Sequence, residues 1–172
     1  YQIVNTLNKN NWKVVFSDKS VSVYQNPNVY PRAYFAKNVE YFSSDQEIIA
    51  NISSQKFDPR STALVQSDKS IAIGFDPDSK ISIKKHFSQG IDLEVSTATS
   101  SFMIISNSYD PGWKAKINGR ATEVYKTNAS FLGLKISPGD SSVHLFYLPD
   151  SFVAGSIIST ISLLIIFLTL IF

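Results

Sequence analysis

The chain has 172 residues, 44% of them apolar, which is enough for one domain with a real core. Its formal net charge is +2, so electrostatics give no case for nucleic-acid binding. It has no cysteine, which excludes disulfides, thiolate catalysis and cysteine metal sites. That absence fits either a reducing compartment or a bacterial surface protein that does without disulfides.

Residues 1–110 consist mostly of short segments in which apolar and polar residues alternate, the pattern of β-strands. The predicted strands in this region are 12–16, 21–25, 33–42, 62–66, 71–75, 81–87, 91–97 and 102–108. Asp, Ser, Pro and Gly separate them at intervals of about ten residues, which favours a mainly β fold of the sandwich or jelly-roll kind.

One short helix is predicted from about residue 45 to residue 54. Ser44 and Glu47 stand in the S-x-x-E arrangement of a capping box. Ile48, Ile49 and Ile52 follow and form the apolar stripe that such a helix would bury.

The segment 109–119, YDPGWKAKING, predicts a turn, a strand and a hairpin. Trp113, Ala115 and Ile117 alternate with Lys114 and Lys116, so one face of the strand belongs to the core and the other to water. This alternation favours burial of Trp113 and makes the segment a structural corner. Its aromatic residues, with Tyr125 and Phe131, could alternatively stack on sugar rings if they are exposed.

The pair Asn118-Gly119 predicts a two-residue type I′ turn with both residues at positive φ. The return strand is expected at 121–127, followed by strands at 131–136 and 143–148, with a turn at Pro138-Gly139-Asp140. Both faces of the last strand are largely apolar. We therefore expect the sandwich to cover one face and a helix or lipid to cover the other.

The composition of the sequence changes after Asp150, which is the last charged residue. Val153 to Phe172 contains no charged residue, and as a helix its 20 residues would be about 30 Å long, the thickness of the hydrocarbon core. Its Ser and Thr hydroxyls can bond back to their own helix. Pro149 blocks extension of the helix upstream, and Asp150 or Ser151 can cap its first turn. The alternative, a buried helix of a soluble protein, seldom stays apolar all round for so long.

We therefore expect one β-sandwich domain at 1–150 and a transmembrane helix at 151–172, joined by a short connection. The first ten residues, YQIVNTLNKN, lack the basic and apolar regions of a signal peptide. The chain is therefore interpreted as the tail of a longer protein. No charged residue follows the apolar segment, so the positive-inside rule does not set its orientation.

A search for catalytic and metal-binding residues yields weak candidates. His86 and His144 lie in predicted strands outside any catalytic motif, and ordinary sheet positions explain both. Asp76-Pro77-Asp78 has a spacing that could hold a divalent cation, but a polar turn explains it equally well. We therefore expect no catalytic residue, no metal site and no cofactor in this chain.

Three other polar features are noted. Lys84-Lys85-His86 is a small basic patch that could face lipid headgroups. Asp92 and Glu94 share one face of a strand, which is typical of a solvated sheet. Asn51-Ile52-Ser53 and Asn128-Ala129-Ser130 match the N-x-S acceptor form, but so many Asn and Ser make chance matches expected.

Two segments resemble the YfhO-type family of bacterial membrane proteins. Residues 108–159 are similar to the family's C-terminal end, in which a PGW-containing strand and hairpin are followed by two strands and a membrane helix. VYQNPNVYPRAYFAKNVE (23–40) is similar to a second family segment, with Asn26, Pro27, Asn28, Pro31 and Arg32 at the matching places.

The resemblance implies a large polytopic protein related to the GT-C class of membrane glycosyltransferases. Such enzymes transfer a sugar from a polyprenyl-phosphate donor to cell-surface polymers or lipids outside the cytoplasm. Their catalytic carboxylates lie in early loops that this chain does not contain, and Asp76-Pro77-Asp78 does not match them. The resemblance therefore makes this chain an extracytoplasmic accessory domain that covers the active site or positions an acceptor.

Within that reading, Arg32, Tyr109 and Trp113 are the candidate glycan or acceptor contacts. The planar guanidinium of Arg32 suits a phosphate or a glycan carboxylate, although an internal salt bridge is the simpler role. Asp110 stands where the family often has a second aromatic residue, which weakens the sugar-stacking hypothesis there.

The expected partners are the lipid bilayer, a polyprenyl-linked sugar or cell-surface glycan, and the remaining membrane helices of the same protein, with no nucleic acid. One rival hypothesis is a membrane-anchored module that binds carbohydrate or protein without catalysis. Another is a purely structural cap that binds no ligand.

Overall fold

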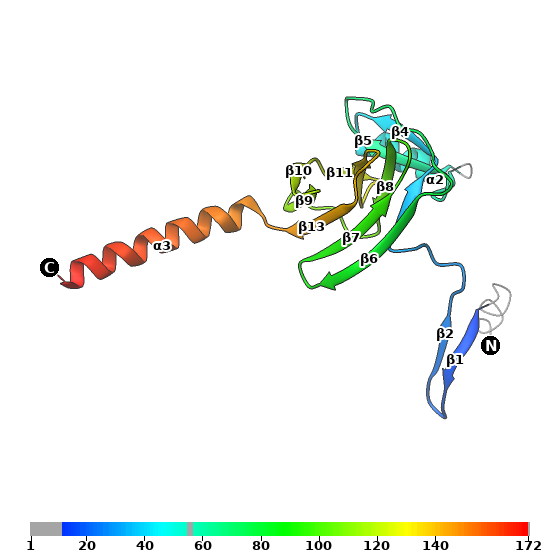
Figure 1. Cartoon of the computed structure of the whole chain (residues 1–172). Helices are drawn as coiled ribbons and strands as arrows, with labels where there is room; N and C mark the ends of the chain where they lie inside the picture. Colours follow the sequence, from blue (N-terminus) through cyan, green and yellow to red (C-terminus); the bar gives the residue numbers. More distant parts are fainter. Residues whose placement is uncertain (1–11, 55–56, 172) are drawn as a thin grey trace. The chain divides into compact units, whose positions relative to one another are not determined.

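The computed structural model describes residues 12–54 and 57–171, and the chain divides into two compact units at Pro31 (Figure 1). In the first unit, β1 (Lys13–Ser17) and β2 (Ser22–Gln25) form an antiparallel hairpin. The Asp18 carboxylate accepts hydrogen bonds from the backbone N–H groups of Ser20 and Val21, at 2.7 and 2.8 Å. The two predicted strands and the turn between them are confirmed. Residues 1–11 lie outside the described residues, and they include all ten residues on which the absence of a signal peptide was predicted.

The second unit, from Arg32 onward, contains two β-sheets, as the sequence predicts. In the five-stranded sheet the strand order is β10 (Arg120–Thr122), β9 (Trp113–Ile117), β13 (Ser142–Tyr147), β7 (Gly90–Ser96) and β6 (Lys80–Phe87). In the six-stranded sheet the order is β3 (Ala33–Ala36), β8 (Ser101–Ile105), β12 (Phe131–Ile136), β11 (Tyr125–Thr127), β5 (Thr62–Gln66) and β4 (Asn38–Phe42). All neighbouring strands are antiparallel except β4 and β5.

The six-stranded sheet curls back toward itself. Its two edge strands, β3 and β4, are separated in sequence by Lys37 alone. Because consecutive Cα atoms are about 3.8 Å apart, the end of one edge must lie close to the start of the other. The backbone N–H groups of Lys37 and Asn38 both donate to the carbonyl of Ser61 at 2.9 Å, which fixes this corner. The predicted single strand 33–42 is thus wrong, because the chain bends at Lys37 and passes from one edge to the other.

Two apolar clusters follow from this arrangement. The larger one lies between the sheets and combines Leu93 and Leu145 of the five-stranded sheet with Met103 and Leu134 of the six-stranded sheet. The buried residues of the smaller cluster, which include Phe102, all come from the six-stranded sheet. They fill the inside of its curl. All five residues of β8 are buried, because its alternate side chains enter different clusters.

Gly133 in β12 shows why the curl needs a residue without a side chain. A Cβ at this position would lie 2.3 Å from the Thr127 hydroxyl oxygen and 2.5 Å from the ring of Phe102. The Phe102 ring therefore lies over the glycine and closes the smaller cluster.

The predicted helix is α2 (Asp45–Ser53), and it contacts β4 and β5. The hydroxyl of Ser44 accepts a hydrogen bond from the Glu47 N–H at 3.4 Å, which confirms Ser44 as the N-cap. Of the predicted apolar stripe only Ile48 is buried, whereas Ile49 and Ile52 are exposed.

Both predicted turns of the last third are confirmed. Asn118 and Gly119 have φ values of 48° and 79°, as a type I′ turn requires. In the turn after β12, Gly139 has φ 87°, and Asp140 donates its N–H to the carbonyl of Ser137 at 3.0 Å.

Two further predicted strands are corrected. Residues 71–75 belong to no strand; the carbonyl of Ile71 accepts from the Tyr41 hydroxyl, and the N–H of Gly74 donates to Ser100. The return strand 121–127 is two strands, β10 and β11, which lie in different sheets. The chain crosses between the sheets at Glu123 and Val124, and this crossing interrupts the strand.

The last strand, β13, leads into α3 (Asp150–Ile171) through Leu148 and Pro149 (Figure 1). The carbonyl of Pro149 accepts from the N–H groups of Phe152 and Val153, so the helix begins at Asp150. All described side chains of α3 are exposed, and within the described ranges it is the one helix long and apolar enough to cross a membrane. Phe172, the last residue of the predicted span, lies outside the described residues.

The hydroxyls of Thr160, Ser162 and Thr169 in α3 bond back to their own helix, as expected. Thr160 donates to the carbonyl of Ser156 at 2.8 Å, and Ser162 donates to Ile158 at 2.9 Å. These bonds satisfy the polar atoms that would otherwise be unpaired in lipid.

Candidate functional site

The corner before β9 is held together by the Asp110 carboxylate. Its Oδ1 atom accepts from the N–H of Gly112 at 2.7 Å and from the hydroxyl of Tyr147 at 3.0 Å. The N–H of Trp113 donates to the carbonyl of Asp110, also at 3.0 Å. A Cβ on Gly112 would lie 2.8 Å from the Tyr147 ring, so only glycine lets the ring lie this close to the turn. The expected structural corner is present.

The hydrogen bond to Asp110 also changes the chemistry of Tyr147. Together with partial desolvation and the nearby negative charge, this bond raises the pKa of the Tyr147 phenol above its ordinary value. Tyr147 therefore acts as a neutral hydrogen-bond donor in the corner at physiological pH.

Trp113 is half-buried, so the expected burial is only partly achieved. Its ring packs against the cluster between the sheets and meets the Tyr147 ring edge-on, with centroids 5.4 Å apart. Its indole N–H donates to the carbonyl of Ser108 at 3.1 Å. The remaining exposed part of the ring is available to a ligand.

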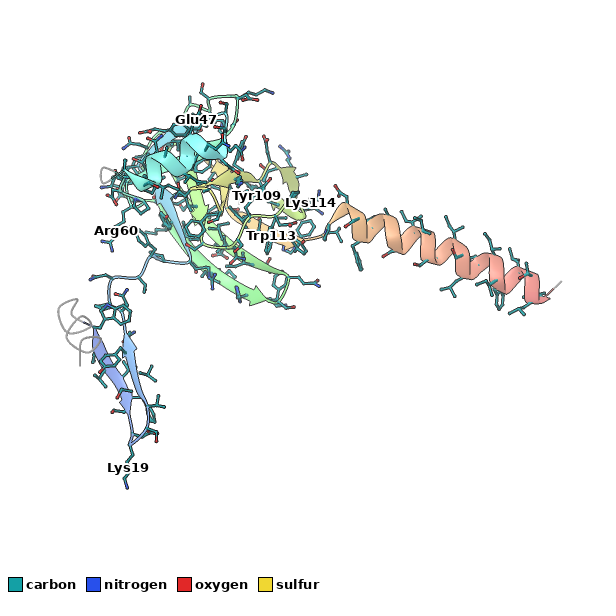
Figure 2. All side chains as sticks on the ribbon, turned by 180° about the vertical axis from the view of Figure 1, so that it is seen from behind. Lys19, Glu47, Arg60, Tyr109, Trp113 and Lys114 are labelled. Carbon is teal, nitrogen blue, oxygen red and sulfur yellow. The ribbon has the colours of Figure 1, made fainter. Side chains whose placement is uncertain are left out.

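A pocket of about 460 Å³ opens beside this corner. Its walls come from the corner, from β9 and β10, and from the end of β13: Tyr109, Pro111, Trp113, Lys114, Ala115, Lys116, Ala121, Thr122, Glu123, Val124, Phe146 and Leu148. Figure 2 labels Tyr109, Trp113 and Lys114, which lie together at this end of the second unit. Three aromatic rings, two lysines and one carboxylate therefore surround a largely apolar hollow.

The pocket adjoins the start of the membrane helix. Leu148 in its wall stands two residues before α3, and the ammonium group of Lys114 lies 3.1 Å from the carboxylate of Asp150 in the first helical turn. Both partners are substantially exposed, so this ion pair contributes little to stability. Its consequence is positional, because it ties β9 to the first turn of α3.

Arg32, the third candidate, does not line the pocket. One nitrogen of its guanidinium, Nη1, donates to the carbonyl of Ser106 at 2.8 Å and to the side-chain oxygen of Asn107 at 2.9 Å. The ion pairs recorded among the described residues do not include Arg32, so the expected salt bridge is replaced by bonds to neutral oxygens. Arg32 thus holds the segment that leads from β8 toward Tyr109.

The structure explains the Asp76-Pro77-Asp78 segment without a cation. The two oxygens of Asp76 accept from the backbone N–H groups of Ala98, at 2.7 Å, and Asp78, at 2.9 Å. These bonds hold the pKa of Asp76 below its usual value. No group of three potential metal ligands occurs among residues 12–54 and 57–171.

The two histidines lie in strands, as expected. His86 is exposed in β6, and His144 is exposed in β13, where its Nδ1 atom lies 2.5 Å from a carboxylate oxygen of Asp92. Asn128, in one of the N-x-S matches, is buried, and its side-chain oxygen accepts from the N–H of Leu64. It is therefore a structural residue of the turn between β11 and β12.

Sequence reasoning missed the pocket residues that come from other segments, chiefly Lys116, Glu123 and Phe146. The available signal was the register of the final strands: Phe146 lies opposite Lys114 in β9, so the two side chains share one face of the sheet. That register depends on a strand pairing that the alternation of residues does not reveal.

The comparisons with known proteins agree on one family. The family model described as "Bacterial membrane protein YfhO" matches residues 1–159. "Uncharacterized protein YfhO" of Bacillus subtilis (strain 168) is 36% identical over 64 residues, which cover 37% of this chain and 7% of that protein. The matched region is thus a small part of that relative's length. No solved structure matches the chain.

Proposed function

Because the chain belongs to the YfhO family of bacterial membrane proteins, we propose that it is the C-terminal extracytoplasmic domain and last membrane helix of a larger polytopic glycosyltransferase. The whole protein would take sugar from a polyprenyl-phosphate donor and attach it to a cell-surface glycan or lipid. The part described here would not catalyse transfer. It would position the acceptor beside the membrane or cover the active site.

The observation that carries this proposal is the pocket between Tyr109, Trp113 and Phe146. Partly exposed aromatic rings supply apolar surface for the C–H faces of a sugar ring, and polar groups at the rim supply its hydrogen bonds. Thr122, Glu123 and Lys116 lie in the wall and provide an acceptor and donors for hydroxyl groups. The position next to α3 suits a ligand presented at a bilayer surface.

In this proposal Arg32 has a supporting role. Its bonds to Ser106 and Asn107 fix the segment that carries Tyr109, so its loss would disturb the pocket indirectly. Tyr109 and Trp113 are the residues proposed to contact the glycan.

Intrinsic fluorescence tests the binding step. The chain has two tryptophans, so replacing Trp12 with Phe leaves Trp113 as the only indole. In nanodiscs, titration of this variant with glucose, galactose and N-acetylglucosamine should shift or quench Trp113 emission for at least one sugar. Tyr109→Ala and Phe146→Ala should weaken that response at least ten-fold, whereas Phe75→Ala, an exposed ring outside the pocket, should leave it unchanged.

If no sugar changes the emission, or if Phe75→Ala weakens the response equally, the pocket is not a glycan site. The domain would then be the structural cap of the rival hypothesis.

The catalytic context needs the whole parent protein. Bacteria expressing it with Tyr109→Ala should retain the protein in the membrane but transfer less sugar to cell-surface polymers than bacteria expressing the Phe75→Ala control. Sugar binding without any transfer by the parent protein would instead favour the non-catalytic binding module.

A further inference from the structure

The outer face of the five-stranded sheet carries a column of three rings. Phe87 of β6 stacks on His144 of β13 with centroids 6.1 Å apart and planes 21° apart. His144 stacks in turn on Phe146 at 5.0 Å and 23°. These side chains point away from the cluster between the sheets, so the column stands on a face that the described residues leave open.

A lysine lies at each end of the column. The ammonium group of Lys85 is 6.0 Å from the centre of the Phe87 ring, and that of Lys116 is 5.9 Å from the centre of the Phe146 ring. Neither lysine takes part in an ion pair recorded among residues 12–54 and 57–171. Both are exposed, so both charges are available to an external anion.

The acidic residues of β7 on this face are already engaged. Asp92 contacts His144, and Glu94 forms an ion pair with Lys84 at 2.8 Å. The face therefore combines partly exposed aromatic rings with two lysines that form no recorded ion pair, of which Lys85 lies opposite Asp92 in the sheet register. This combination fits an anionic phospholipid surface, where lysines meet headgroups and aromatic rings lie at the interface.

The column is also continuous with the membrane helix. His144 and Phe146 lie on β13, and only Leu148 and Pro149 separate that strand from α3. Four residues of extended chain span at most about 14 Å, so Phe146 lies within that distance of Asp150. Its position places the face within reach of the headgroups around α3.

We propose that the outer face of the five-stranded sheet docks on the anionic bilayer that α3 enters, with Lys85 and Lys116 contacting lipid phosphates and Phe87 and Phe146 entering the interface. The docking would orient the domain at the membrane. Lys116 and Phe146 also line the pocket, so the docked domain uses them for lipid and the undocked domain leaves them to a glycan. It does not depend on a glycan ligand or on a glycosyltransferase activity.

The absence of cysteine makes a direct test possible. A fluorophore on Ser82→Cys reports the outer face, because Ser82 lies opposite Glu94 in the sheet. A fluorophore on Ser53→Cys, an exposed position of α2, serves as the control, because α2 packs on the other sheet. Each labelled full-length chain is placed in nanodiscs that contain a lipid with a nitroxide on its headgroup.

In nanodiscs with phosphatidylglycerol, the label at residue 82 should be quenched much more strongly than the label at residue 53. The difference should fall in pure phosphatidylcholine. Lys85→Gln combined with Lys116→Gln should lower the equilibrium constant for docking about 25-fold, since each lysine near an anionic surface raises that constant about five-fold. The matched control, Lys37→Gln with Lys69→Gln, removes the same charge from exposed positions elsewhere and should leave the quenching intact.

Equal quenching of the two labels, or equal quenching at residue 82 in neutral and anionic lipid, would overturn the proposal. So would an equal effect of both lysine pairs. Absence of quenching at both labels would show that this face meets water or a protein partner instead.

Discussion

The two sheets of the second unit differ in how many faces they bury. The six-stranded sheet is covered on one face by its partner sheet and on the other by its own curl, so all five residues of β8 are buried. In β13 of the five-stranded sheet, buried Val143 and Leu145 alternate with the more exposed His144 and Phe146. The first sheet therefore acts as the scaffold, whereas the second leaves its outer face and its edge accessible.

A matched pair of phenylalanine truncations tests this division most strongly. Phe102 is fully buried in the smaller cluster, so we expect Phe102→Ala to lower the free energy of unfolding by about 3–5 kcal/mol. Phe146 is only partly buried on the open face, and Phe146→Ala should cost about 1 kcal/mol. Chemical denaturation in detergent micelles, followed by tryptophan fluorescence, measures both. Equal losses would mean that the outer face is part of the core.

The hairpin at the edge of the five-stranded sheet gives the next largest effect. Asn118 adopts a positive φ, and its side-chain oxygen accepts from the N–H groups of Ser141 and Ser142. Asn118→Ala loses these bonds and strains the turn, so we expect a loss of about 2–3 kcal/mol. Asn118→Gly keeps the turn and loses only the bonds, which should cost about 1 kcal/mol. Equal losses in the same denaturation assay would remove backbone strain from the explanation.

The pKa values of two tyrosines, one in each sheet, provide a further test of the comparison. Burial, followed by the hydrogen bond that its hydroxyl donates to Glu123, raises the pKa of Tyr125 in the six-stranded sheet to about 12. In the five-stranded sheet the Asp110 hydrogen bond is the main cause of the raised pKa of Tyr147. Asp110→Asn should therefore return Tyr147 most of the way to its ordinary pKa. Glu123→Gln should leave Tyr125 clearly above it, because burial remains.

The sign of the stability effect follows from these pKa values. A tyrosine whose pKa is raised on folding stabilises the folded state below pH 10, its pKa in the unfolded chain. For Tyr125 this stabilisation is lost as the pH rises from 10 to about 12. NMR titration of ring-labelled tyrosine follows each residue separately. A Tyr125 pKa near 10 would contradict its burial in the scaffold sheet.

The alternation of apolar and polar residues predicted most strands, because it records which face of a strand is buried. It does not record which strand lies alongside. The segments 33–42 and 121–127 were therefore each predicted as a single strand. The bend at Lys37 divides the first into strands at opposite edges of one sheet, and the crossing at Glu123 divides the second into strands of different sheets. Turns fared better, since Asn118-Gly119 has a local conformational cause that needs no distant neighbour.

The candidate site shows the same limit. Tyr109 and Trp113 could be chosen from the sequence because they belong to one corner, and the structure places both in one pocket. Phe146 and Glu123 could not, since they reach the pocket through strand register and a crossover between sheets. Arg32 was chosen for its chemistry, but its neighbours in space, Ser106 and Asn107, engage it in the framework.

The central claim is that the β unit stands outside the cytoplasm, beside the membrane that α3 crosses. A cysteine at Ser53 in the parent protein, with any other cysteines replaced, tests this in intact bacteria with a membrane-impermeant maleimide. We expect full labelling from outside the cells, and no gain when the inner membrane is permeabilised. Labelling only after permeabilisation would put the unit in the cytoplasm and contradict both its extracytoplasmic position and its proposed role with cell-surface glycans.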